Sequence, residues 1–179
     1  MTAEQIIVAA IRIAGSLPVL RWPFWGALVA ILVDFSDLFW MNLIDLGGLG
    51  DYQSFDKWVD LVYMATFLAV ALRWTGLAKR VAVGLFVFRI AGDIIFEATG
   101  TRAVLLAFPN VFEFWFVFVA ARDQFKPHYK ITPRRAVVWL IVLTAAKEFQ
   151  EYALHLGKWF DRYTFFEFWG VLWHAATPW

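Results

Sequence analysis

Six acidic residues interrupt apolar stretches of this chain, where a charge is costly. They are Asp34, Asp37, Asp93, Glu113, Glu148 and Glu151, and the bases that share these stretches are Arg89 and Lys147. A charge in hydrocarbon costs a few kcal/mol or more, so an ionisable residue within an apolar span is by default a candidate for a functional site. Two bases cannot neutralise six carboxylates, and the remainder must be protonated or must hold a cation. The pattern therefore predicts a site for a metal ion or for protons.

A divalent metal ion is the cofactor that these residue types favour. Glu148, Glu151 and His155 recur along one helical face, and we expect Asp34 and Asp37 to complete a site from another helix. Oxygen ligands with one histidine suit Mg, Mn, Ca or non-haem Fe. The alternative for the histidine is a structural role at a helix end. No nucleotide-binding motif is present, and the placement of the three histidines does not suit haem b.

The elements that position these residues are predicted to be membrane-spanning helices. The chain has 179 residues, of which 61% are hydrophobic and 20% aromatic, a composition far from that of soluble proteins. We therefore expect an all-α fold: one membrane domain over residues 1–179 with five transmembrane helices, at about 22–46, 55–75, 79–98, 102–121 and 135–157. Residues 3–16 predict a helix too short to span, which lies in the membrane interface. The aromatic tail, 159–179, predicts a short interfacial or re-entrant segment.

The basic residues predict the orientation in a plasma or inner membrane. The segment 122–135 carries five of them, and the connection between the second and third spans is also basic, whereas the connections at 46–55 and 98–102 are not. The positive-inside rule then puts the N-terminus in the cytoplasm and the C-terminus outside. The segment 122–135 is also expected to contact anionic lipids and not nucleic acid.

In this orientation every span contributes polar residues to the outer half of the membrane. Asp56 and Asp60 lie in the outer turns of the second span, Asn110 near the middle of the fourth, and His155 in the outer half of the fifth. Polar stripes on apolar helices face one another or a water-filled cavity, because lipid would leave them unsatisfied. The sequence thus predicts a carboxylate cavity that opens outward.

A purely structural network is the alternative interpretation of the same charges. Arg89 with Asp93, and Lys147 with Glu151, have the i, i+4 spacing of pairs within one helix. Buried ion pairs of this kind can fix the register of helices without any chemistry. Pro109 is expected to free a backbone carbonyl, with the Asn110 amide near Glu113, or else to kink the helix for packing alone. The aromatic residues at 112–118 are expected to face lipid for the most part.

Two resemblances add to this reading. Asp34-Phe-Ser-Asp37 followed by Asp56-Lys-Trp-Val-Asp60 resembles the paired aspartates of the CDP-alcohol phosphatidyltransferases, which implies divalent metals held on successive helices. Leu38 stands where that family has glycine, and Met41-Asn42 where it has Ala-Arg, so the determinants of CDP binding are missing.

The stretch 88–116, with Tyr52-Gln53-x-x-Asp56-Lys57, resembles an uncharacterised bacterial family of polytopic membrane proteins, and that resemblance implies no activity.

Three functions are compatible with this pattern. The first is a small carrier or binding protein for a cation, metal-dependent or proton-coupled, in which Arg89 and Lys147 hold the acids in place or contact an anionic headgroup. The second is a metal-dependent enzyme that acts on a lipid-linked substrate at the outer leaflet. The third is a non-catalytic subunit of a larger membrane complex or homo-oligomer, in which the charges serve assembly.

Overall fold

A computed structural model describes residues 3–43, 52–101, 104 and 107–152. The regular structure of these residues is helical throughout, which confirms the predicted all-α class for the part of the chain that is described. In chain order the elements are α1 (Ala3–Ser16), the 3₁₀ helix η1 (Leu17–Leu20), α2 (Pro23–Leu43), α3 (Tyr52–Ala71), α4 (Gly76–Thr99), α6 (Val111–Phe125) and α7 (Pro133–Glu151). Most of them begin and end within a few residues of the helices expected from hydropathy.

The fourth predicted span is the exception. Hydropathy predicts a helix over 102–121, but α6 begins only at Val111. Pro109 has no N–H to donate and constrains the residue before it, so the helix cannot run continuously through this position. At this break the Phe108 carbonyl accepts a hydrogen bond from the Arg89 side chain.

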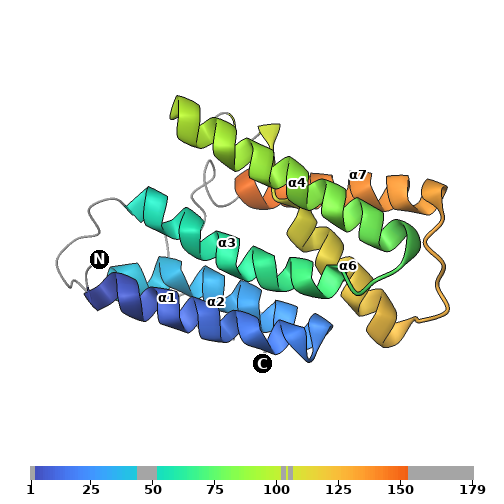
Figure 1. Ribbon diagram of the computed structural model, residues 1–179, viewed down its shortest axis with the longest axis horizontal. Coiled ribbons are helices and arrows are strands. Elements are labelled where there is room, and N and C mark those ends of the chain that lie inside the picture. Colours follow the sequence, from blue (N-terminus) through green and yellow to red (C-terminus); the bar gives the residue numbers. More distant parts are fainter. Residues whose placement is uncertain (1–2, 44–51, 102–103, 105–106, 153–179) are drawn as a thin grey trace, which may run out of the picture.

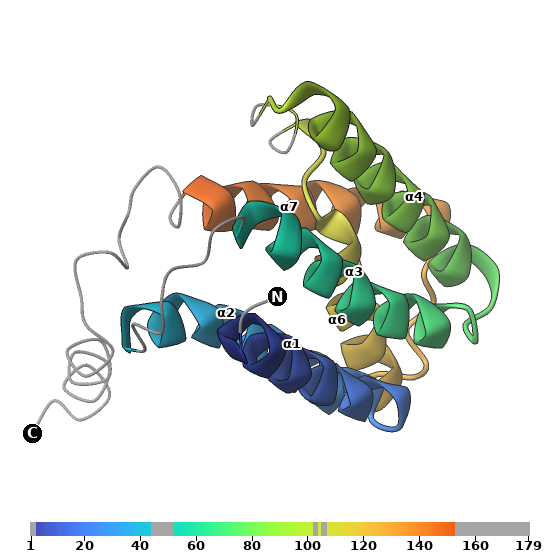
Figure 2. The same ribbon diagram turned by 60° about the vertical axis from the view of Figure 1, so that its left-hand side comes forward.

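The helices form a bundle with α3 and α6 at its centre. α3 lies between α1 and α2 on one side and α4 on the other (Figures 1 and 2). α6 packs against α2, α3, α4 and α7. All helices that carry candidate site residues therefore contact one of these two central helices.

Three aromatic side chains near the start and middle of α6 fill the core. Phe112, Trp115 and Phe116 are fully buried, and the Phe116 ring lies 4.3 Å from that of Phe67 on α3, centroid to centroid. The Trp115 indole donates a hydrogen bond to the Ala78 carbonyl of α4, with 3.2 Å between donor and acceptor. The expectation that the aromatic residues at 112–118 mostly face lipid is wrong for these three, because α6 is central and has neighbours around most of its circumference.

Large apolar side chains are exposed on the bundle while some charged side chains are buried in it. Leu32, Ile94 and Ile141 are 64–68% exposed, whereas Arg12 and Glu113 are only 5% and 7% exposed. By a conventional measure of length and hydropathy, none of the helices in the described ranges qualifies as a membrane span.

Candidate functional site

One guanidinium joins the first three helices. Arg12 of α1 points into the bundle, and its Nη2 donates to Oδ1 of Asp34 on α2 and to Oδ1 of Asp60 on α3. The Arg12 side chain is 4% exposed, while those of Asp34 and Asp60 are 35% and 28% exposed. A single buried cation thus shares its charge between two carboxylates from different helices.

A second polar group lies one turn further along α3. The Tyr63 hydroxyl donates to Glu113 Oε2 of α6 at 3.2 Å, and the Asn110 amide nitrogen lies 3.1 Å from the Tyr63 oxygen and 3.4 Å from Glu113 Oε2. All three residues are buried. The hydrogen-bond donors that these contacts bring to the Glu113 carboxylate are neutral.

The break before α6 explains why Asn110 and Glu113 meet. Asn110 is the N-cap residue, but its side chain makes no capping bond to the helix and turns to Tyr63 and Glu113 instead. Glu113 lies in the first turn, where the helix dipole favours a negative charge. The Asn110 Oδ1 atom is buried and accepts no hydrogen bond from the described residues. An amide oxygen without a donor therefore lies close to a buried carboxylate.

Two further cations act on Glu113 from neighbouring helices. Arg89 of α4 donates from Nη1 to the Phe108 carbonyl at 3.1 Å and pairs with Asp93 at 3.0 Å. Lys147 of α7 is buried, pairs with Glu151 at 2.9 Å and donates to the Gln150 side chain. Lys147 exerts the larger electrostatic effect on the Glu113 carboxylate and Arg89 a smaller one. Each cation therefore has a carboxylate of its own helix besides Glu113.

Glu113 also lines an apolar hollow between α2, α6 and α7, with a volume of about 340 Å³. Its walls include Ile31, Phe114, Phe118, Trp139 and Leu143, and Gln150 adds an amide. We call it the Glu113 hollow. A carboxylate at the wall of an otherwise apolar space favours a bound proton or a nearby cation, since the apolar surroundings do not solvate its negative charge.

The structure brings together some of the predicted site residues and separates others. Asp34 meets Asp60 through Arg12, Asn110 meets Glu113, and the i, i+4 pairs of Arg89 and Lys147 form as the alternative interpretation predicts. Glu148 is half-buried on α7. The side chains of Asp37 and Asp56, and the whole of His155, lie outside the described residues.

The described residues do not by themselves assemble a metal centre. Among them, no group of three or more His, Asp or Glu side chains is placed to hold a metal ion. Two of the predicted ligands, Asp37 and His155, fall outside this part of the chain, so the metal site stays a prediction.

Sequence reasoning missed Arg12 and Tyr63. Arg12 was assigned to an interfacial helix, although a lone base within the apolar stretch 3–16 is the same signal that singled out the acids. Ser16, one turn later on the same face, is fully buried as well. Tyr63 carries no such signal, because a tyrosine in an apolar helix is unremarkable until its partner is known.

Comparisons with protein-family models, with curated proteins and with solved structures find no match for this chain.

Proposed function

We propose that this protein is a membrane-embedded helical bundle that binds a cation at Glu113. The bound cation is a proton or another small cation. The observation that carries the proposal is a buried carboxylate whose hydrogen-bond donors are neutral and which lines an apolar hollow. In the orientation expected from the basic loops, the N-terminus is cytoplasmic, and Glu113 lies near the middle of its span in a cavity that opens outward.

Placement in a membrane is supported by the distribution of polar and apolar side chains. Large aliphatic residues on α2, α4 and α7 are exposed, while Arg12, Glu113 and Lys147 are turned inward. Water would favour the reverse arrangement, whereas lipid favours this one, because ionisable residues in a bilayer face the interior of a bundle and pair there. The charges that lower the hydropathy of α4 and α7 include two pairs within the bundle, Arg89 with Asp93 and Lys147 with Glu151.

Cation binding is supported by the balance of charge in the interior. The carboxylates of the network belong to Asp34, Asp60, Asp93, Glu113 and Glu151, and its bases are Arg12, Arg89 and Lys147. Arg12 extends the set of bases deduced from the sequence, yet carboxylates still outnumber them. Asp34, Asp60 and Glu151 are 35%, 28% and 26% exposed, so water screens part of their charge, whereas Glu113 is buried. A buried carboxylate is neutralised by a base, a proton or a bound cation. The Asn110 Oδ1 atom adds an oxygen ligand beside Glu113.

Cation binding is tested with the purified full chain in detergent. The thermal midpoint is measured from acid to alkaline pH and with Na⁺, K⁺, Mg²⁺, Ca²⁺ and tetramethylammonium, with chelator as the control for divalent ions. We expect the thermal midpoint to change with pH or with one of these cations. The Glu113→Gln variant should lose this change. Glu97→Gln, which changes an exposed carboxylate on α4, should keep it. An unchanged response in Glu113→Gln would overturn the proposal for this residue.

Membrane placement is tested separately. Membranes from cells that express the chain are washed at alkaline pH and with urea, and the protein should stay with the lipid fraction in flotation. Release into the wash would refute an embedded bundle and would leave the test of Glu113 intact.

A further inference from the structure

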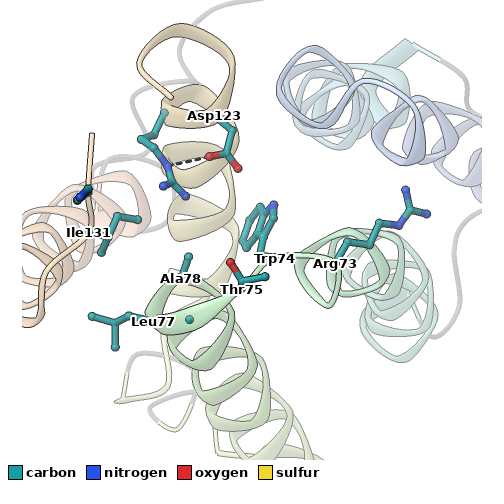
Figure 3. A pocket seen from close by; sticks show the side chains of 10 residues that line it. Arg73, Trp74, Thr75, Leu77, Ala78, Asp123 and Ile131 are labelled. Carbon is teal, nitrogen blue, oxygen red and sulfur yellow. Dashed lines mark ion pairs between the residues drawn. The ribbon is translucent and has the colours of Figure 1, made fainter. Parts of the chain in front are cut away.

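A second hollow lies at the end of the bundle where α3 turns into α4 and where α6 leads into α7 (Figure 3). Its volume is about 410 Å³, and it is lined by Trp74, Thr75, Leu77, Arg122, Asp123 and Lys130, among others. We call it the basic hollow. Its residues come from segments far apart in sequence, which α6 brings to one place, and it shares no lining residue with the Glu113 hollow.

The charge around the basic hollow is predominantly positive. Arg122 and Lys130 line it together with one carboxylate, Asp123, and Arg73 adds a third base. The Arg73 guanidinium donates to the Leu20 carbonyl at 3.1 Å and points away from Asp123 (Figure 3), so it contributes charge and not a contact. Cations in excess of carboxylates attract an anion, and a partly enclosed space strengthens that attraction relative to open solvent.

Arg122 is held in place but has donor capacity left. Its Nε lies 2.9 Å from Asp123 Oδ1 and its Nη1 lies 3.5 Å from the Tyr129 carbonyl. The buried Nε has no hydrogen bond of good geometry among the described residues. A guanidinium presents five N–H donors in a fixed fork, which suits the tetrahedral oxygens of a phosphate group.

The first turn of α4 adds neutral donors to these cations. Thr75 is the N-cap residue and makes no side-chain capping bond, and residues 75–78 line the basic hollow. A Cβ atom built on Gly76 would meet no atom within 4 Å, so the space beside this glycine is open. The backbone N–H groups of a first helical turn have no partner within the helix and favour a bound anion.

We propose that the basic hollow binds a phosphate group, held by Arg122, Lys130 and the first turn of α4. Two sources share this chemistry: the headgroup of an anionic phospholipid and free inorganic phosphate. The proposal goes beyond cation binding at Glu113 and does not depend on it, because the two hollows have separate linings.

The test measures the thermal midpoint of the full chain in a neutral detergent. One arm adds inorganic phosphate against chloride at equal ionic strength. The other adds short-chain phosphatidylglycerol against phosphatidylcholine. Variants are Arg122→Gln, Lys130→Gln and, as the control, Arg134→Gln, which removes an exposed charge from the first turn of α7, outside the hollow.

We expect stabilisation by at least one of the two ligands, with an apparent affinity about tenfold weaker in Lys130→Gln and unchanged in Arg134→Gln. A response to phosphatidylglycerol alone identifies the lipid headgroup as the ligand, and a response to phosphate alone identifies the free anion. Because Lys130 is exposed, its variant should fold even if Arg122→Gln does not. No response in either arm, or equal weakening in Arg134→Gln and Lys130→Gln, would overturn the proposal.

Discussion

Replacing Arg12 by methionine should destabilise the protein more than any other single change of charge in the described part of the chain. The variant removes the cation that bonds both Asp34 and Asp60 and leaves two carboxylates of neighbouring helices close together. Methionine is apolar and of similar length, so it fills much of the space of the lost side chain.

The magnitude follows from the burial of the three groups. Removal of one partner from a buried ion pair costs about 3–5 kcal/mol, because the other charge is left without compensation. Asp34 and Asp60 are about one-third exposed, so water screens part of the repulsion and the lower end, about 3 kcal/mol, applies. For a chain of this size, that loss lowers the thermal midpoint by about 6–12 °C.

The assay measures thermal unfolding in detergent. It compares Arg12→Met with the triple variant Arg12→Met/Asp34→Asn/Asp60→Asn and with Arg80→Met, a control that changes an exposed base. The triple variant should regain most of the lost stability, since the amides carry no charge that needs neutralising. A midpoint of Arg12→Met within about 1 °C of the unmodified chain would refute the bridging role. So would a triple variant that is no more stable than the single one.

Three other predictions concern the packing, the pH dependence and the helix ends. Gly26→Ala should lower the free energy of unfolding by about 3 kcal/mol, because the added Cβ would lie 2.3 Å from a backbone nitrogen of η1. Gly84→Ala has open space around the added Cβ and should raise the free energy of unfolding by about 0.5–1 kcal/mol. Partial desolvation of Asp123, whose side chain is still 45% exposed, raises its pKa, and the neighbouring Arg122 guanidinium partly offsets this effect. The folded chain therefore binds this proton more tightly than the unfolded chain. Asp123 therefore stabilises the fold at low pH. This contribution is lost as pH rises past the pKa of an ordinary aspartate, about 3.9. In the Asp123→Asn variant, the free energy of unfolding should no longer fall over this pH range. Thr132→Ala should cost about 0.5–1 kcal/mol in a denaturant titration, because the hydroxyl caps α7, whereas Thr75→Ala loses no such cap.

The local features of the fold follow from the sequence alone. The 3.6-residue period of a helix places residues four apart on the same face, so the pairs Arg89–Asp93 and Lys147–Glu151 could be predicted without any knowledge of neighbouring helices. Pro109 likewise predicted a departure from a regular helix, and α6 begins only at Val111. The bounds of α1 depended only on its apolar stretch and the proline that follows it.

The contacts between helices were decided by the tertiary structure. Asp34 and Asp60 are separated by 26 positions, and Arg12 by 22 from the nearer of them, so only the packing of α1 against α2 and α3 makes them one group. In the same way, Tyr63 meets Glu113 across 50 positions. Hydropathy and spacing determine which face of each helix is polar, because these are properties of one helix. The order of helices in the bundle determines which polar faces meet, and that order depends on interactions that no single segment contains.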